Sequence, residues 1–369
     1  MQDYLRIKRR ITKTATVGNI KIGSEHPVAV QTMTNTLTTD VQATLTQINK
    51  CYEAGAEIVR VSVPDKESGV ALKQIVKASP VPIIADIHFH YRRGIEAVEA
   101  GAACIRINPG NIGDPNKAKQ IIQACKNNGS SIRIGVNTGS LDKEILQKYH
   151  EPCPEAMVES AMKSIEMLES MDFYNTKISV KATNVMLMIK SYQLLAQKTD
   201  YPLHLGVTEA GSLMTGAVRS GLGIGTLLLN GIGDTIRVSL TNPPEEEIPV
   251  AYEILKSLGI RKRGVNIIAC PSCARQQFDV IKVVHQVEEL TKNILLPISI
   301  SMLGCVVNGL GEAQHTDIGV TGAGSGNHLI YKYGEPYIKS TSDNLVESIV
   351  KVVKEVEKEG GSKKLSDLQ

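Results

Sequence analysis

The chain has 369 residues, of which 42% are hydrophobic and 21% are charged, and its formal net charge is +3. This composition is typical of a folded globular protein and excludes extensive disorder. The charge is too small to indicate a nucleic-acid surface, and the basic stretch at residues 6–10 is interpreted as a solvated terminus. The first eleven residues resemble neither a secretory signal nor a transit peptide, and no stretch is apolar enough to span a membrane. We therefore expect a cytoplasmic protein that binds neither nucleic acid nor membranes.

The first two thirds of the sequence alternate short β-branched runs with helical stretches, a pattern typical of a parallel sheet. A small hairpin at residues 13–23 comes first, and we expect it to close the floor of the fold. Strands are predicted at residues 28–33, 57–63, 82–88, 104–108, 132–137, 177–183, 203–208 and 235–240. Helices are predicted between them, among others at residues 40–54, 114–128, 154–171, 184–197 and 245–258. This α/β order and size predict a (β/α)8 TIM-like barrel, with a doubly wound open sheet as the alternative.

The composition changes after residue 259, and residues 261–264, Arg-Lys-Arg-Gly, read as a linker. The chain then predicts a strand, a cysteine turn, a helix at 277–292 and a strand at 297–303. A glycine-rich loop, two short strands and a helix at 343–359 follow. We therefore predict a barrel domain at residues 1–260 and a smaller α+β domain at residues 264–369.

Polar side chains recur at alternate positions near the ends of the predicted barrel strands. Side chains alternate between the two faces of a strand, and the helices must cover the apolar face. The polar set should therefore point into the barrel near the carboxyl ends of the strands, where barrel enzymes place their active sites. The candidate substrate-binding residues are Arg60, Asp86, His88, Arg106, Asn108, Arg133, Asn137, Lys181, His204 and Arg237.

This inward set has a surplus of positive charge. Five cations, Arg60, Arg106, Arg133, Lys181 and Arg237, stand against Asp86 and Glu209, which gives +5 − 2 = +3. Burying an unpaired charge costs several kcal/mol, so the surplus indicates a bound anion, and guanidinium groups suit phosphate oxygens. Structural salt bridges could account for one or two of the cations. We therefore predict a phosphorylated or diphosphorylated substrate.

Glycines at 221, 223 and 225 are not followed by the Lys-Ser/Thr pair of a phosphate loop, so they indicate close helix packing.

Seven cysteines, an odd number, argue against a disulfide framework in an intracellular chain. Four of them, at positions 51, 104, 125 and 153, are assigned packing or surface roles. Cys270 and Cys273 form a C-x-x-C turn, and Cys305 lies in a second loop; both zinc and iron–sulfur clusters use such spacing. The fourth ligand is open: His315 is ten residues beyond Cys305, whereas Glu312 is closer, in a glycine-flanked loop, and could equally be a solvated carboxylate.

Three thiolates and one oxygen ligand around a cubane would leave one iron with an exchangeable ligand. The chain contains no C-x3-C-x2-C run, which excludes the usual radical-SAM arrangement.

Several motifs together resemble one enzyme family, the 4-hydroxy-3-methylbut-2-enyl diphosphate synthases of isoprenoid precursor biosynthesis. The motifs, in chain order, are Val-Gln-Thr-Met-Thr-Asn-Thr (30–36), Ala-Asp-Ile-His-Phe (85–89), Arg-Ile-Asn-Pro-Gly-Asn-Ile-Gly (106–113), Arg-Ile-Gly-Val-Asn (133–137), Ser-Val-Lys-Ala (179–182), Gly-Val-Thr-Glu-Ala-Gly (206–211), Cys-Pro-Ser-Cys (270–273) and Cys-Val-Val-Asn-Gly (305–309). The chain departs from the family pattern at Leu310, where proline is usual, and at Thr183-Asn184, where Ser-Asp is common. We expect Leu310 to loosen the loop that carries Glu312.

The resemblance implies one [4Fe–4S] cluster per chain, held by Cys270, Cys273, Cys305 and Glu312. It also implies that the cationic barrel mouth grips the diphosphate of 2-C-methyl-D-erythritol 2,4-cyclodiphosphate, which is reductively opened and dehydroxylated in the methylerythritol phosphate pathway. Glu312 and Glu209 are the candidate catalytic residues. Glu209 would stabilise charge or handle a proton, or would instead pair with a barrel arginine.

The resemblance also implies flavodoxin or ferredoxin as the electron donor. A short linker from the bottom of the barrel would not let the cluster domain reach the barrel's own mouth. We therefore predict a head-to-tail homodimer in which the cluster of one chain caps the barrel of the other.

Two other classes of protein remain open from the residues alone. One is a redox-silent barrel, such as a lyase or a pterin-diphosphate transferase, with a zinc-stabilised tail. The other is an RNA- or metal-binding module, although three Phe and no Trp leave little for base stacking.

Overall fold

The computed structural model describes residues 7–87, 90–107, 115–324 and 326–363. The described chain forms two compact units, which are divided between Arg261 and Lys262. No helix in these ranges combines the length and the apolar character needed to cross a membrane.

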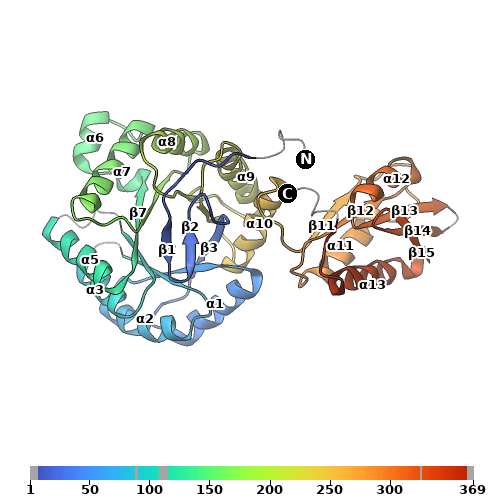
Figure 1. Ribbon diagram of the computed structural model, residues 1–369, viewed down its shortest axis with the longest axis horizontal. Coiled ribbons are helices and arrows are strands. Elements are labelled where there is room, and N and C mark those ends of the chain that lie inside the picture. The colour runs from blue at the N-terminus through green and yellow to red at the C-terminus, as the bar shows by residue number, and fades with distance from the viewer. Residues whose placement is uncertain (1–6, 88–89, 108–114, 325, 364–369) are drawn as a thin grey trace. The chain divides into compact units, whose positions relative to one another are not determined.

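The first unit is a parallel barrel of eight strands surrounded by helices, as the sequence predicted (Figure 1). Its strands are β3 Ala29–Met33, β4 Ile58–Ser62, β5 Ile83–Asp86, β6 Cys104–Ile107, β7 Ser131–Asn137, β8 Thr176–Lys181, β9 His204–Leu205 and β10 Thr235–Ile236. The outer helices are α1 Val41–Ala54, α2 Lys66–Ala78, α3 Tyr91–Glu99, α5 Pro115–Asn128, α6 Lys143–Tyr149, α7 Pro154–Glu169, α8 Val185–Lys198, α9 Leu213–Leu229 and α10 Glu247–Ser257. The strands run in the order β8-β7-β6-β5-β4-β3-β10-β9, and a parallel bridge between Ile178 and Leu203 joins the two ends.

Local signals in the sequence set the helix ends. The carboxylate of Asp40 accepts a hydrogen bond from the Ala43 amide at 2.9 Å at the start of α1, and Asn184 caps α8 through the Leu187 amide at 2.9 Å. Such caps satisfy amides that have no partner within the helix. At the end of α1, Gly55 adopts a φ of 112°, a left-handed conformation that glycine tolerates.

Glycines 221, 223 and 225 lie within α9, so the helical interpretation of this run is confirmed. A Cβ on Gly223 would lie 2.8 Å from a methyl carbon of Val207, so glycine lets α9 approach the segment that follows β9.

A hairpin closes the barrel floor, as predicted. It consists of β1 Ala15–Val17 and β2 Ile20–Ile22, paired antiparallel. Val17 and Ile22 are fully buried in a small cluster that includes Ile58, Ile84 and Cys104 from the lower ends of the strands. This apolar cluster fills the described lower end of the barrel, so the polar side chains of the interior lie toward the carboxyl ends of the strands.

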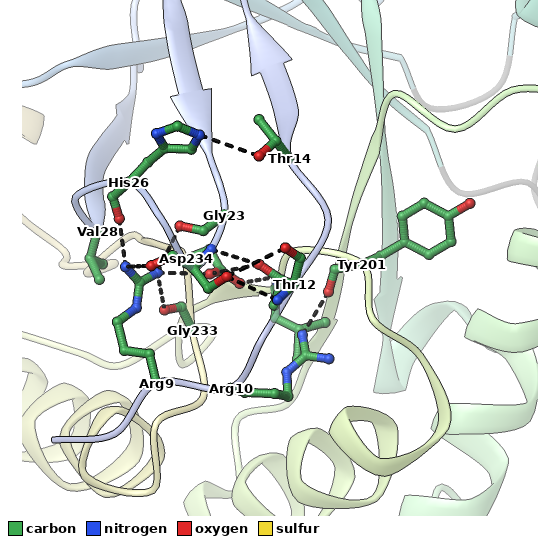
Figure 2. A network of polar contacts seen from close by, with 12 residues as sticks. Arg9, Arg10, Thr12, Thr14, Gly23, His26, Val28, Tyr201, Gly233 and Asp234 are labelled. Carbon is green, nitrogen blue, oxygen red and sulfur yellow. Dashed lines mark hydrogen bonds and ion pairs between the residues drawn. The ribbon is translucent and has the colours of Figure 1, made fainter.

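The basic stretch near the N-terminus is not simply a solvated terminus, which corrects the sequence interpretation. Figure 2 shows Arg9 and Arg10 directed into the barrel unit. Arg9 Nη2 lies 2.8 Å from Asp234 Oδ1, and Arg10 Nη2 donates to the Tyr201 carbonyl at 2.7 Å. Asp234 also accepts from the Leu203 amide at 2.9 Å and is only 2% exposed. The two arginines therefore fasten the N-terminal segment to the strands β9 and β10.

The second unit is a mixed five-stranded sheet with helices on both faces (Figure 1). Its strands are β11 Val265–Ala269, β12 Ile298–Leu303, β13 Ile318–Gly324, β14 Asn327–Lys332 and β15 Glu335–Thr341, and its helices are α11 Val280–Thr291, α12 Val306–His315 and α13 Leu345–Lys358. The first three strands are parallel and the last two pairs are antiparallel. Three strands stand where two were predicted after the glycine-rich stretch, because the chain makes a second tight turn at Tyr333 and Gly334, both with positive φ.

Candidate active site

The alternating pattern of the barrel strands orients the polar side chains inward. Val59, Val61 and Ile105 belong to the core beneath the outer helices. The intervening residues Arg106 and Arg133 are 5% and 1% exposed. Because apolar side chains fill the described floor, these charged groups lie in a protein interior above it. His88 and Asn108, which the sequence also placed in this set, lie outside the described residues.

The carboxylate of Asp86 contacts two arginines at once. Its Oδ1 lies 3.3 Å from Arg106 Nη1, and its Oδ2 lies 3.7 Å from Arg60 Nε. Burial lowers the pKa of Arg60 to about 10, an effect that Asp86 opposes. Arg106 Nη2 also donates to the Gly135 carbonyl at 3.3 Å, and with its amide rotated by 180° Asn137 would accept from the same nitrogen at 3.0 Å. One carboxylate thus fixes the orientation of two guanidinium groups without neutralising both.

Arg237 has a partner that the sequence analysis missed. Its Nε and Nη2 each lie 3.1 Å from a carboxylate oxygen of Glu247, the first residue of α10. Glu247 also accepts from Thr32 Oγ1 at 2.7 Å and from the Leu240 amide at 3.1 Å, and it is 2% exposed. In the sequence Glu247 is the last of three consecutive glutamates at a helix start, so nothing distinguished it from solvated neighbours.

Lys181 and Arg133 have no ion pair among the described residues. Burial, and then the positive charge of Arg133, lower the pKa of Lys181 well below its ordinary value. Gly206 makes room for this ammonium, since a Cβ there would lie 2.5 Å from Lys181 Nζ. Gly135 does the same for Arg106, whose Nε would lie 2.5 Å from an added Cβ.

His204 is fully buried on β9, and its Nδ1 lies 2.8 Å from Thr235 Oγ1 on β10. Burial lowers the pKa of this imidazole well below its ordinary value, and the charges of Lys181 and Arg133 lower it further. The imidazole is therefore neutral at physiological pH and serves as a hydrogen-bonding group.

Glu209 does not belong to the inward set, which corrects the charge count. It is exposed, in a bend beyond β9, with a φ of 52° that side chains other than glycine rarely adopt. No described arginine pairs with it. The backbone around it is held by Arg219, which donates to the Ala210 carbonyl at 3.1 Å, and by the Thr241 amide, which donates to the Gly211 carbonyl at 2.9 Å.

The corrected interior holds more positive charge than the sequence indicated. Its described cations are Arg60, Arg106, Arg133, Lys177, Lys181 and Arg237, and its carboxylates are Asp86 and Glu247, which gives +6 − 2 = +4. Lys177 shares its strand face with Lys181, four residues away, so the same alternation that identified Lys181 could have identified it. Salt bridges absorb part of the charge and leave an interior suited to an anion.

The cysteine turn lies at the carboxyl edge of the parallel strands in the second unit. Cys270 follows β11, and its Sγ accepts a hydrogen bond from the Gly304 amide at 3.4 Å. The Gln277 amide also donates to the Gly304 carbonyl at 2.8 Å, so the turn after β11 packs against the turn that carries Cys305. Ser272, between the two cysteines of the turn, has a φ of 65°. Cys270, Cys273 and Cys305 are all free thiols and at least partly exposed.

The segment that carries Glu312 is a helix, which corrects the predicted glycine-rich loop. It forms α12, and its glycines serve packing: a Cβ on Gly309 would lie 2.3 Å from a methyl carbon of Thr321 on β13. Leu310 is 51% exposed within this helix, so it does not loosen a loop; leucine favours a helix, whereas proline would interrupt one.

Glu312 is exposed two turns beyond Cys305. Within the described ranges, no three His, Cys, Asp or Glu side chains already converge as metal ligands. The donor chemistry nevertheless fits a thiolate-bound iron–sulfur group, because two adjacent turns present three free thiols and a backbone amide already donates to one of them.

The remaining cysteines have the structural roles that the sequence indicated. Cys51, Cys104 and Cys125 are buried, and burial raises the pKa of Cys51 to about 12. Cys153 caps α7, where its Sγ accepts from the Ala156 amide at 3.4 Å.

The fold and the site together define a TIM-barrel protein with a cationic interior and a smaller unit that presents cysteines at a sheet edge. Comparison with known families agrees: the model described as the GcpE TIM-barrel domain matches residues 12–252, and the GcpE protein C-terminal domain matches residues 266–355. The chain belongs to this family, that of the 4-hydroxy-3-methylbut-2-en-1-yl diphosphate synthases.

Two curated relatives carry the name 4-hydroxy-3-methylbut-2-en-1-yl diphosphate synthase (flavodoxin). The protein from Ruegeria sp. (strain TM1040) is 56% identical over 98% of this chain and 95% of its own length. The protein from Zymomonas mobilis is 56% identical over 90% of this chain and 89% of its own length. Among solved structures, dihydropteroate synthase from Yersinia pestis aligns at 12% identity with a TM-score of 0.45, over 66% of this chain and 98% of that chain.

Proposed function

We propose that this chain converts 2-C-methyl-D-erythritol 2,4-cyclodiphosphate to 4-hydroxy-3-methylbut-2-enyl diphosphate in isoprenoid precursor biosynthesis. The reaction takes up two electrons, opens the cyclic diphosphate and releases water. The observation that carries the proposal is the surplus of buried cations inside a barrel of this family. A diphosphate is the kind of ligand that such an interior needs, because it replaces the missing counter-charge.

The barrel residues bind and orient the diphosphate. Arg60 and Arg106, held by Asp86, present guanidinium groups in a fixed direction, and Arg133 and Lys181 supply charge that described protein carboxylates do not neutralise. During ring opening one phosphate oxygen becomes a leaving group, and the same cations stabilise the negative charge that it gains. Asp86 sets the orientation of Arg60 and Arg106 before the substrate arrives, so these two groups need little reorganisation during the reaction.

Other inward residues position these groups. Glu247 holds Arg237 at the rim through two hydrogen bonds, and the neutral His204 is available as a hydrogen-bond partner. Asn137 completes the contacts around Arg106. His88 and Asn108 stay predictions as substrate ligands.

Glu209 is proposed to stabilise charge or to handle a proton near the reacting carbon. Its strained backbone and its place in the bend beyond β9 are typical of a functional side chain presented at a barrel mouth.

The second unit is proposed to hold one [4Fe–4S] cluster per chain through Cys270, Cys273, Cys305 and Glu312. When bound, such a cluster supplies electrons one at a time. The chain's own contribution is the placement of the thiols on two turns that are already in contact, with the Gly304 amide donating to Cys270 Sγ. Amide hydrogen bonds to sulfur are among the features that set cluster potentials. The exposed carboxylate of Glu312 has no competing ion pair among the described residues.

Flavodoxin is the proposed electron donor, since the curated relatives are named for it. Ferredoxin remains the alternative donor. A head-to-tail homodimer is proposed in which the cluster of one chain serves the barrel of its partner. Mixing an inactive barrel variant, Arg133→Met, with an inactive cluster variant, Cys305→Ala, should restore part of the activity. No recovery after verified subunit exchange would refute this arrangement.

Anaerobic turnover with the cyclodiphosphate and a chemical reductant tests the activity. The wild-type chain should form the product, and Glu312→Ala should lose most of the turnover. Gln314→Ala, an exposed neighbour on the same helix, is the matched control and should retain activity. Metal analysis should find iron and sulfide. One zinc per chain, without iron, would favour the redox-silent barrel and contradict the proposal.

A further inference from the structure

Two buried cations lie side by side on neighbouring barrel strands. Arg133 on β7 pairs in register with Lys177 on β8, and their side chains are 1% and 0% exposed. Arg133 Nε and Nη1 and Lys177 Nζ are buried and have no hydrogen-bond partner among the residues that the structure describes. Buried donors without partners are rare, and each costs free energy.

No described carboxylate forms an ion pair with either of these cations. The buried acids of the barrel unit, in its described ranges, are Asp86, Asp234 and Glu247. Asp86 pairs with two other arginines, and Asp234 is bound by Arg9 at the floor. Glu247 is occupied by Arg237. Asp86 acts electrostatically on Arg133 from a distance, but neither Arg133 nor Lys177 forms an ion pair with a described carboxylate.

A neighbouring group adds hydrogen-bonding capacity. The charges of Arg133 and Lys177 act on the imidazole of His204, whose Nε2 is buried without a partner among the described side chains. When Thr235 donates to His204 Nδ1, the imidazole proton lies on Nε2, which can then donate into the interior. Two cations and a neutral donor suit an oxyanion rather than a metal ion or an apolar group.

We propose that Lys177, beside Arg133, belongs to an anion subsite inside the barrel that binds a phosphate-type oxyanion. The subsite adds Lys177 to the phosphate-binding residues, and it rests on the proposed function only for the identity of the diphosphate. The oxyanion has two possible sources: one phosphate of the substrate, or free inorganic phosphate that occupies the barrel independently.

Lys177 is well suited to such a role. Burial lowers its pKa to about 8, and the charge of Arg133 contributes to the same shift. At neutral pH the ammonium is still mostly protonated, so it can bind an anion, and an anion beside it would favour the charged form. A lysine kept only for packing would be replaceable by methionine without any effect on anion binding.

Binding of inorganic pyrophosphate to the full-length, anaerobically purified chain tests the subsite. We expect Lys177→Met to weaken pyrophosphate binding, measured by calorimetry, by at least about tenfold. Lys190→Met, which removes an exposed lysine on the next helix, should bind as the wild type does. Affinities of Lys177→Met and wild type within twofold of each other would overturn the proposal.

Two further measurements separate the possible sources of the oxyanion and guard against misfolding. The first is a competition between inorganic phosphate and pyrophosphate. If pyrophosphate displaces bound phosphate, the subsite belongs to the substrate's diphosphate. If both bind at the same time, the subsite belongs to the free phosphate ion. If Lys177→Met does not fold, Lys177→Arg should retain pyrophosphate binding and Lys177→Gln should lose it; equal binding by both would refute the subsite. A wild type that binds pyrophosphate through Lys177 but turns over no cyclodiphosphate would refute the proposed function and leave the subsite intact.

Discussion

Replacing Lys177 with methionine is expected to stabilise the empty barrel. The substitution keeps most of the length of the side chain and removes the ammonium group of a residue that is 0% exposed and has no described partner. The pKa of Lys177 is lowered from 10.5 to about 8. The difference, 10.5 − 8, corresponds to about 3 kcal/mol of unfavourable burial of the charged form at neutral pH. We therefore expect Lys177→Met to raise the free energy of unfolding by up to that amount.

The stabilisation should depend on pH in a defined way. Below about pH 8 the folded and the unfolded chain both carry the proton, so the full penalty applies to the wild type. Between about pH 8 and 10.5 Lys177 is protonated only in the unfolded chain, so the cost of burying the charged lysine declines as the pH rises. The advantage of Lys177→Met should therefore be largest near neutral pH and should fade toward pH 10.

Urea unfolding in phosphate-free buffer at several pH values measures this difference. Because the chain has two compact units, hydrogen exchange of the β7 and β8 amides should be used to assign the transition to the barrel. Lys190→Met should show no such pH-dependent advantage. A variant that is less stable than the wild type at neutral pH, or an advantage that persists unchanged at pH 10, would refute the account of Lys177 as an unpaired buried charge.

Other substitutions test the remaining contacts. Gly206→Ala places a Cβ 2.5 Å from Lys181 Nζ and 2.7 Å from the Arg237 carbonyl oxygen, so the ammonium and the backbone after β10 must both shift, and calorimetry should show pyrophosphate affinity reduced by about tenfold; unchanged affinity would show that Lys181 does not contact the anion. Arg9→Ala leaves the buried Asp234 without its ion pair and should lower the free energy of unfolding in urea by about 2 kcal/mol; an unchanged value would mean that the terminal segment adds nothing to stability. Glu247→Gln breaks a buried ion pair and should cost about 3 kcal/mol or more in the same assay, with a loss below 1 kcal/mol contradicting the pairing.

Alternation along the strands determined which residues face the barrel interior. In a pleated strand, successive side chains point to opposite faces, so the apolar neighbours Ile132 and Ile134 indicate the direction of Arg133. The same rule holds for Lys177, which the sequence analysis left out of the inward set and which stands at the very start of the predicted strand. Helix caps and glycines within α9 were likewise local features that the sequence could disclose.

No local sequence pattern could predict the ion pairs between residues that are distant in the chain. Glu247 meets Arg237 because α10 returns across the end of β10, and neither residue type nor spacing predicts that approach. Arg9 binds Asp234, 225 residues away, which turned an apparently solvated terminus into part of the barrel.

Tertiary packing also determined that the segment carrying Glu312 is a helix. Its glycines suggested a loop, since glycine disfavours helices in isolation. Packing against β13 allows a helix there, because Gly309 and Gly319 let α12 and the strand approach closely.

The sequence by itself thus determined the barrel, the inward cationic face and the family resemblance, because these depend on period and residue type along the chain. Only the tertiary structure decided which charges are neutralised. Pairing depends on side chains brought together from different strands and helices, and it left Arg133 and Lys177 as buried cations without a described partner.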